Sequence, residues 1–233
     1  MLFRSEKQLP VNAYEHPTGP RNQIAIAQPG ATTWVRSWVP HFEIQGMVIR
    51  HGEAFTISDH LTVWNGEKAL YRPTVHYAYC PSNEAIVSMR ELEMLNWKLH
   101  TNQRIMNNEI TEGDDRLGVL LMGHPYKSWW TGSLLSIEES RRLIPGQSAT
   151  TVQVSSAVYA AVAWAMKNPA RGLLVPDELP WREVLAYAEK YWGGIHSEAA
   201  DWNPLANRKD LFAGWNNAKV DQNDPWQFTN FLV

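Results

Sequence analysis

Cysteine is nearly absent from this sequence, since Cys80 is the single one among 233 residues. One cysteine excludes a disulfide within the chain and agrees with a reducing compartment, so we expect a cytoplasmic protein. Cys80 precedes Pro81 and has no base beside it in the sequence. This setting favours a buried structural thiol over a catalytic nucleophile.

Basic charge and long apolar runs are also scarce. The chain has 21 Lys and Arg against 24 Asp and Glu, which gives a net charge of -3 and a pI near 6.2. A nucleic-acid-binding surface needs a basic face, so we expect no nucleic-acid partner. The sequence has no run of about eighteen apolar residues and no apolar signal-peptide segment, so we expect no membrane partner.

The glycine pattern of dinucleotide-binding proteins is missing as well. The 14 glycines nowhere form G-x-G-x-x-G, and no strand–helix–strand pattern of about thirty residues precedes the predicted hairpins. We therefore expect that this polypeptide alone does not bind NAD. The sequence also shows no spacing of His, Cys, Asp and Glu that is typical of a metal site.

What the sequence does contain is centred on a predicted hairpin. Asp114 and Asp115 precede a short apolar run, residues 117–122, that predicts a buried strand. Residues 123–125 break this run, and residues 129–135 resume an extended pattern, so we predict a loop of about five residues between two strands. The hairpin brings carboxylates and tryptophans to one end.

Carboxylates beside tryptophans are typical of a site for an organic ammonium group. An anion meets the positive charge while an aromatic face covers the methylene groups, so Asp115, Trp129 and Trp130 are candidates. The simpler interpretation is that acidic residues at a turn are solvated and that paired tryptophans in a strand belong to the core. The residues alone leave both interpretations open.

His51 and Glu53 follow a predicted strand over residues 46–50. Two residues apart on an extended chain, they would face the same side and could both point into a cleft. The alternative is an ion pair on the surface at the end of a strand. His76 lies in a predicted strand over residues 69–79, and we expect a core histidine there rather than a catalytic one.

Local signals and periodicity predict the other elements. Asn65-Gly66 is a type I′ hairpin signal, Ser136 with Glu139 matches a helix capping box, and Pro169 ends the clearest helical pattern. The further predicted strands cover residues 23–27, 32–39, 56–63 and 104–111, and the predicted helices cover residues 82–95, 136–142, 149–168 and 177–193.

We expect three segments along the chain. Residues 1–22 are polar and turn-rich, which predicts an extended lead-in. Residues 23–194 carry the strand and helix patterns of one domain. Residues 195–233 have little regular pattern but many aromatic residues, and a tail this apolar must pack on other structure.

Three stretches resemble bacterial homospermidine synthase, an NAD-dependent enzyme related to saccharopine dehydrogenase: residues 117–185, YRPTVHYAYCP and DPWQFTNFLV. The resemblance extends over nearly all of the chain after about residue 22 and does not include the family's N-terminal, nucleotide-binding half. The chain looks like the C-terminal half of a longer enzyme, either truncated or split, with a nucleotide-binding half encoded separately.

The resemblance implies an α/β (α+β) fold with a mixed, mostly antiparallel sheet and helices on one face, as in the second domain of saccharopine-reductase-like enzymes. That domain also supplies the family's dimer contact, so a homodimer is implied. Residues 195–233 would then pack on the missing nucleotide-binding domain. Residues 23–194 would be the substrate-binding and dimerisation domain.

The family's reaction implies roles for the candidate residues. A hydride passes from putrescine to NAD, ammonia leaves the imine, a second diamine condenses, and the hydride returns to give homospermidine. Each step needs one neutral amine while the distal ammonium groups stay anchored. By resemblance, Glu53 and Asp115 anchor ammonium groups, and His51 relays a proton, as an imidazole can near neutral pH. Trp129 and Trp130 would line the pocket.

Two other functions stay open. The chain could be a non-catalytic polyamine-binding or partner subunit without redox chemistry. It could also be part of a carboxynorspermidine-type or saccharopine-type dehydrogenase, whose substrates carry carboxylates and need arginines in the site. Arg36, Arg50 and Arg72 could supply them, but the stretches quoted above favour the diamine enzyme.

Overall fold

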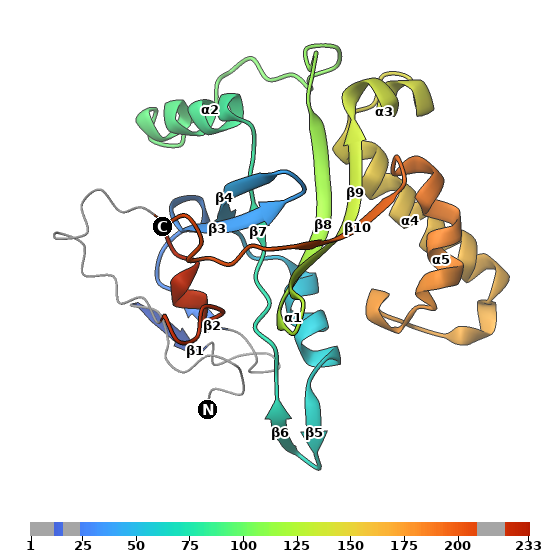
Figure 1. The fold of residues 1–233 in the computed structure, drawn as a ribbon. Coiled ribbons are helices and arrows are strands. Elements are labelled where there is room, and N and C mark those ends of the chain that lie inside the picture. The colour runs from blue at the N-terminus through green and yellow to red at the C-terminus, as the bar shows by residue number, and fades with distance from the viewer. Residues whose placement is uncertain (1–11, 16–23, 209–221) are drawn as a thin grey trace. The chain divides into compact units, whose positions relative to one another are not determined.

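The structure is a computed structural model that describes residues 12–15, 24–208 and 222–233 (Figure 1). The chain divides into two compact units. Unit 1 comprises residues 1–87, 122–128 and 201–233, and unit 2 comprises residues 88–121 and 129–200. The described residues combine helices with small antiparallel sheets, so the expected α+β class is confirmed, with several sheets in place of one.

The main sheet of unit 1 has the strand order β3-β4-β7, with β3 over Trp34–Val39, β4 over Phe42–Val48 and β7 over Ala78–Tyr79. Both pairings are antiparallel. Gly46 allows β7 to approach closely, because a Cβ atom there would lie 2.8 Å from the carbonyl carbon of Ala78. The strand predicted over residues 69–79 is wrong in its middle, because residues 72–77 form no strand and its two ends belong to different sheets.

Two short hairpins accompany this sheet in unit 1. Strand β1 (Ala13–Glu15) pairs with β2 (Ile24–Ile26). A 3-10 turn, η1 (Gly30–Thr32), lies between β2 and β3 in the sequence. Strand β5 (Val63–Asn65) pairs with β6 (Lys68–Tyr71) around Gly66, whose φ of 61° suits the turn. The hairpin predicted from Asn65-Gly66 is confirmed, but its turn is not type I′: Asn65 pairs with Lys68, so Gly66 and Glu67 form the turn, and of these two only Gly66 has a positive φ.

Helix α1 (Gly52–His60) replaces the strand predicted over residues 56–63. The β-branched residues of this stretch favour a strand, but contacts made by the helix outweigh that preference. Ser58 is buried, and its hydroxyl donates to the carbonyl oxygen of Pro73 at 3.1 Å. Glu53 in the first turn and His60 in the last turn also suit the helix dipole.

The C-terminal segment packs within unit 1. Its aromatic residues Trp202, Phe228 and Phe231 are buried, and Phe228 begins the 3-10 turn η5 (Phe228–Asn230). The ring of His76 meets the rings of Phe228 and Phe231 edge-on, with centroid distances of 5.1 and 5.2 Å. His76 thus packs against core residues, as expected, although it is itself only partly buried. Other aromatic residues of the tail, Phe212 and Trp215, lie outside the described residues.

Acid is expected to destabilise unit 1 through His76. Burial lowers the pKa of His76 from 6.5 to about 4. Above pH 6.5 the imidazole is neutral in the folded and the unfolded chain. As the pH falls from 6.5 towards 4, the unfolded chain binds a proton that the folded chain does not. The free energy of unfolding should therefore fall by about 3 kcal/mol, as urea unfolding at several pH values would measure.

The His76→Phe variant provides the control for this effect. It keeps an aromatic ring against Phe228 and Phe231 and removes the titrating group. Subtracting its pH dependence from that of the unmodified chain isolates the contribution of His76. Equal acid sensitivity of the two proteins would contradict the prediction.

The sheet of unit 2 has the strand order β10-β9-β8, with β8 over Asp114–His124, β9 over Lys127–Ser136 and β10 over Ile195–Ala200. The predicted hairpin is confirmed, although its strands are longer and its turn has two residues, Pro125 and Tyr126. The expectation that its first strand is buried is wrong, because the apolar side chains of Leu117, Val119 and Leu121 are exposed. The turn is tight because Gly123 and Lys127 adopt positive φ angles of 80° and 67°. The tip, residues 122–128, belongs to unit 1.

Helices α3, α4 and α5 lie along one side of this sheet (Figure 1). Helix α3 (Ile137–Leu143) begins at the predicted cap, where the Ser136 hydroxyl accepts from the backbone N–H of Glu139 at 3.1 Å. Helix α4 (Ala149–Lys167) matches its prediction closely and is capped in the same way by Ser148. Leu135, Ala149 and Val152 form the core between β9 and α4.

The helix predicted over residues 177–193 is interrupted. A 3-10 turn, η3 (Pro176–Glu178), precedes α5 (Trp181–Ala188), and a second one, η4 (Glu189–Tyr191), follows it. Pro180 is the reason, since it holds Leu179 in an extended conformation with ψ of 146°. Helix α4 ends before Pro169, as predicted. A further 3-10 turn, η2 (Pro169–Arg171), follows it.

Helix α2 (Asn83–Met94) agrees with the predicted helix over residues 82–95. The strand predicted over residues 104–111 is wrong, because this stretch forms no regular element; Arg104 and Glu109 make an ion pair across it. Among the described residues, no helix is both long and apolar enough to cross a membrane.

Candidate functional site

His51 and Glu53 lie together where β4 gives way to α1. His51 is extended, with φ of -134° and ψ of 135°, and occupies the N-cap position of the helix, while Glu53 is in its first turn. The prediction that both lie on a strand is therefore wrong, but the two side chains do meet. The imidazole Nδ1 and the carboxylate Oε2 are in hydrogen-bond contact.

This contact determines which imidazole nitrogen can exchange a proton. A carboxylate oxygen accepts, so Nδ1–H donates to Glu53 and the neutral imidazole carries its lone pair on Nε2. The two side chains remain 42% and 58% exposed, so both are accessible. A base oriented by a carboxylate and open to solvent can take a proton from a substrate amine.

Tyr77 is a third side chain at this position, and the sequence analysis did not identify it. Its ring stacks on the His51 imidazole, with ring centroids 4.7 Å apart and planes inclined by 14°. Tyr79 lies beside it, with ring centroids 6.4 Å apart. A histidine, a carboxylate and an aromatic face are thus combined within unit 1.

Asp115 lies in unit 2, near the start of β8, and the first turns of α4 hold it. Its carboxylate accepts from the Thr150 hydroxyl, and its backbone carbonyl accepts from the buried Gln153 side chain at 3.2 Å. The N-terminal end of a helix favours a negative charge nearby. No ion pair among the described residues includes Asp115, so its charge can serve a cationic ligand.

Asp114 differs from its neighbour in this respect. Its carboxylate accepts from Arg116 at 2.8 and 3.0 Å, and the two charges compensate each other. Only Asp115 of the acidic pair therefore keeps an uncompensated charge among the described residues. Because Asp115 and the His51–Glu53 pair belong to different units, the structure describes the two groups separately.

The two tryptophans have different surroundings in unit 2. Trp130 is only 2% exposed, and its ring lies against Gly118. Trp129 is partly exposed, and its indole N–H donates to the Ser197 hydroxyl on β10 at 2.9 Å. Burial of this degree assigns Trp130 to the core, so Trp129 is the better candidate for a pocket wall.

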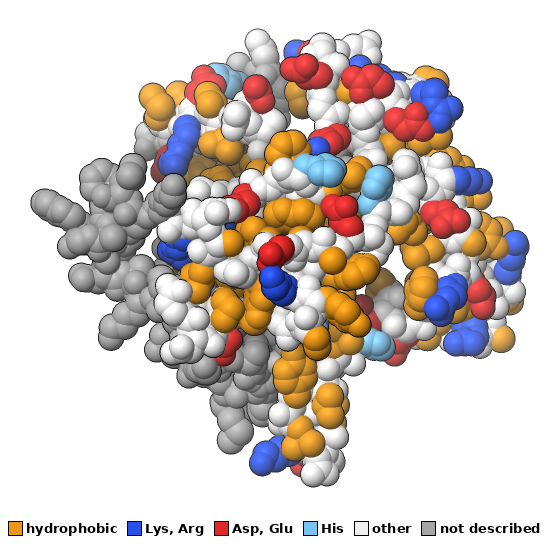
Figure 2. All heavy atoms as spheres, viewed as in Figure 1, with side chains coloured by type: hydrophobic (Ala, Val, Ile, Leu, Met, Phe, Trp, Pro, Cys, Tyr) orange, Lys and Arg blue, Asp and Glu red, His pale blue; other side chains and the backbone are white. Residues whose placement is uncertain are grey.

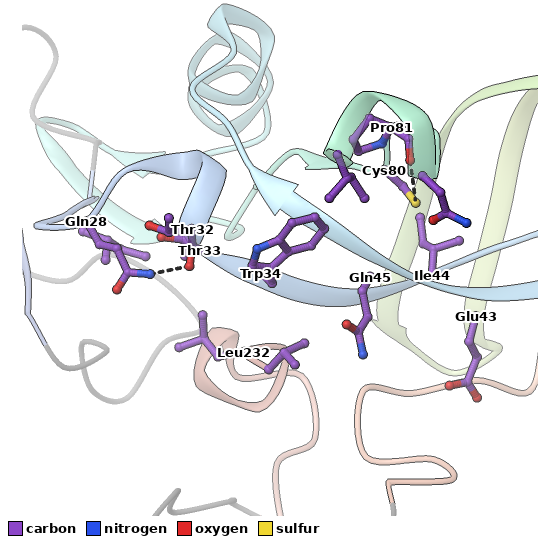
Figure 3. Close-up of a pocket in the computed structure, with 14 residues that line it drawn as sticks. Gln28, Thr32, Thr33, Trp34, Glu43, Ile44, Gln45, Cys80, Pro81 and Leu232 are labelled. Carbon is purple, nitrogen blue, oxygen red and sulfur yellow. Dashed lines mark hydrogen bonds between the residues drawn. The ribbon is translucent and has the colours of Figure 1, made fainter. Parts of the chain in front are cut away.

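A pocket of about 710 Å³ in unit 1 contains none of these residues (Figure 3). Several of its polar side chains already have partners within the chain. The Thr32 hydroxyl donates to the Pro29 carbonyl at 3.0 Å, and Glu43 accepts from Arg36 at 2.6 Å. Cys80 at its edge is an exposed residue, contrary to the prediction of a buried thiol. Partial desolvation of its thiol group raises the pKa of Cys80. This pocket is therefore a weaker candidate than the His51–Glu53 site.

No cluster of three or more His, Cys, Asp or Glu side chains with metal-binding geometry occurs among the residues that the structure describes. The candidate site itself combines an imidazole, a carboxylate and an aromatic ring.

Relatives of this chain are known. Homospermidine synthases from Blastochloris viridis and Mesorhizobium japonicum are 45% and 42% identical to it over 231 residues, which are 98% of this chain and 47% of each relative. A crystal structure of the homospermidine synthase from Legionella pneumophila in complex with NAD superposes with a TM-score of 0.91 at 40% identity. The superposition includes 98% of this chain and 49% of the Legionella pneumophila chain.

The chain thus spans about half the length of these relatives. Residues 4–198 match the family described as saccharopine dehydrogenase C-terminal domain. The chain belongs to the saccharopine dehydrogenase C-terminal domain family.

Proposed function

We propose that this chain is the diamine-binding part of an NAD-dependent homospermidine synthase. The observation that carries the proposal is the His51–Glu53 contact, which orients a solvent-accessible base beside a carboxylate. The homospermidine synthase relatives support the substrate class. A diamine needs both groups, because one nitrogen must lose a proton while the distal ammonium group stays bound.

In this proposal His51 accepts a proton at Nε2 from a substrate ammonium nitrogen. The N–H bond of the substrate breaks, a new N–H bond forms on the imidazole, and the resulting imidazolium is stabilised by the negative charge of Glu53. The second carboxylate oxygen of Glu53, and Asp115, anchor ammonium groups. Trp129 offers an aromatic surface for methylene groups.

NAD would supply hydride transfer when bound. The described strand pairings with a defined register, β1–β2, β3–β4, β4–β7 and β5–β6, are antiparallel, whereas the usual dinucleotide cradle is a parallel strand–helix–strand unit. These antiparallel pairings support a nucleotide-binding site outside the described residues. We place the nucleotide-binding site in the half of the relatives that this chain does not match.

The alternative with carboxylate-bearing substrates is less well supported. Arg36 donates to Glu43 and to the carbonyl oxygens of Pro204 and Ala206. Arg72 is 5% exposed and pairs with Asp59. Two of the three arginines considered for such a substrate are thus engaged within the chain.

Complementation tests the proposal. The unmatched half of the Blastochloris viridis homospermidine synthase is fused to this chain or supplied in trans, and homospermidine formation from putrescine and NAD is measured. We expect product only when both parts are present, and no heat of NAD binding to this chain alone at micromolar concentration.

Tight stoichiometric NAD binding by the isolated chain would show that the cofactor assignment is wrong. Diamine binding without turnover in the fusion protein would favour a non-catalytic polyamine-binding subunit.

Removing either proposed anchor should weaken diamine binding. Glu53→Gln or Asp115→Asn deletes a charge-assisted contact worth about 1.5–3 kcal/mol, or about ten to 150 fold in affinity. Calorimetric titration of the fusion protein with putrescine measures this loss. Asp114→Asn is the matched control, since Arg116 already compensates that carboxylate. Unchanged affinity in both anchor variants would assign these carboxylates to the solvated surface.

We also propose that the chain forms a homodimer through α4. Val154, Val158, Val162 and Met166 are 53–78% exposed and lie four residues apart, so they share one helix face. Apolar side chains reach the surface between charged ones in Figure 2 as well. Sedimentation should show a dimer at tens of micromolar and a monomer for Val158→Asp. Val87→Asp, at an exposed valine on α2, should leave the dimer intact.

A further inference from the structure

The ring stack of Tyr77 on His51 is not explained by the packing of the core. His51 is accessible, and Tyr77 is only partly buried. A centroid distance of 4.7 Å with a 14° inclination is nevertheless close and nearly parallel. The stack covers one face of the imidazole and opposes rotation of the ring.

Strand pairing places Tyr77 at this position. In the β4–β7 ladder Met47 pairs with Tyr79 and Val48 pairs with Ala78. Because this ladder is antiparallel, the residue before Ala78 lies beside the chain that follows Val48 and leads to His51. The close approach of β7 depends on Gly46, where a side chain would meet the backbone of Ala78 and Tyr79.

Two contacts together define the orientation of the imidazole. Glu53 engages Nδ1 at the edge of the ring, and Tyr77 covers one face of the ring. The hydrogen bond to Nδ1 alone leaves the imidazole free to tilt about the line of that bond. The stack on Tyr77 alone leaves the imidazole free to turn within its own plane. Each contact therefore removes the motion that the other permits, and the direction of Nε2 is fixed.

We propose that Tyr77 is a positioning residue, which holds the His51 imidazole so that its Nε2 nitrogen meets the substrate amine. This role deepens the proposed homospermidine synthase function and rests on it. Tyr77 acts on His51 through its ring, so phenylalanine, which keeps the ring, should keep the stack. Misplacing a catalytic group by about 1 Å can cost about a hundredfold in rate.

Kinetics of the fusion protein test this role. Tyr77→Leu should lower kcat by about ten to a hundred fold with diamine affinity unchanged, because the base is misplaced while the anchors remain. Tyr77→Phe should restore kcat to within about twofold, because the ring stack is retained. Tyr71→Leu, at an exposed tyrosine on β6, is the control and should be neutral.

A double-mutant cycle separates this inference from the proposed function. If Tyr77 acts through His51, Tyr77→Leu should have no further effect on kcat in the His51→Ala background. Should His51→Ala lower kcat while Tyr77→Leu alone does not, the positioning role is wrong and the proposed function stands. Should His51→Ala itself leave kcat unchanged, the proposed function of this site fails, and the positioning role fails with it.

A measurement without turnover addresses the stack directly. In the NMR spectrum of the chain, the Tyr77 ring current should shift the carbon-bound proton signals of the His51 imidazole upfield. Tyr77→Leu should remove this shift and Tyr77→Phe should keep it. Identical His51 signals in all three proteins would overturn the inference, whatever the outcome of the activity assays.

Discussion

Replacing His51 with alanine is expected to lower the turnover of the complemented enzyme by about 10²–10⁴ fold, the usual contribution of general acid–base catalysis. The reason is the geometry of the pair. Glu53 accepts from Nδ1 and leaves Nε2 as the group that exchanges a proton with the substrate amine. Alanine removes this group but leaves both proposed ammonium anchors, so diamine affinity should change little.

Binding and turnover must be measured separately, because KM equals a dissociation constant only when chemistry is slow. Putrescine affinity from calorimetry and kcat from homospermidine formation give the two quantities. His60→Ala is the matched control: it removes an exposed histidine from the last turn of the same helix, α1. A His51→Ala variant with normal kcat would show that this imidazole does not relay the proton.

The elements predicted correctly from the sequence are those whose signals are local. The turn at Asn65-Gly66 needs only the positive φ of Gly66, and the start of α3 needs only the Ser136 hydroxyl and the Glu139 N–H. Pro169 likewise ends α4 by its own covalent structure. Such signals act within a few residues, so no knowledge of the tertiary structure is needed to interpret them.

Elements determined by distant contacts could not be predicted in this way. The stretch at residues 56–63 has β-branched residues typical of a strand, yet it forms much of helix α1, in which Ser58 bonds to Pro73. Pro180 gave a local signal, but it permits either the first turn of a helix or a break before it, and the structure has the break.

The candidate site follows the same division. The i, i+2 spacing correctly suggested that His51 and Glu53 meet, although they do so at a helix N-terminus and not on a strand. Tyr77 could not be identified, because its position beside His51 depends on the register of β4 against β7. Strand alternation indicates that Trp129 and Trp130 face opposite sides, but it does not indicate which side is the core.

The structure now makes that distinction, and Trp130→Ala should destabilise the protein by about 3–5 kcal/mol, the usual cost of deleting a buried tryptophan ring. Trp130 is 2% exposed, and its ring lies where a Cβ atom on Gly118 would come within 2.4 Å of it. Trp129→Ala is the matched control and should cost about 1 kcal/mol, since that ring is partly exposed. Urea unfolding followed by circular dichroism measures both values.

A second substitution tests the contact itself. Gly118→Ala should also destabilise the protein, by about 1–3 kcal/mol, because its new methyl group overlaps the Trp130 ring. In the Trp130→Ala background the ring is gone and the methyl group gains space, so Gly118→Ala should cost clearly less there. Equal costs in the two backgrounds would show that the ring does not lie on Gly118. A Trp129→Ala variant less stable than Trp130→Ala would exchange the two roles and make Trp130 the candidate for the pocket wall.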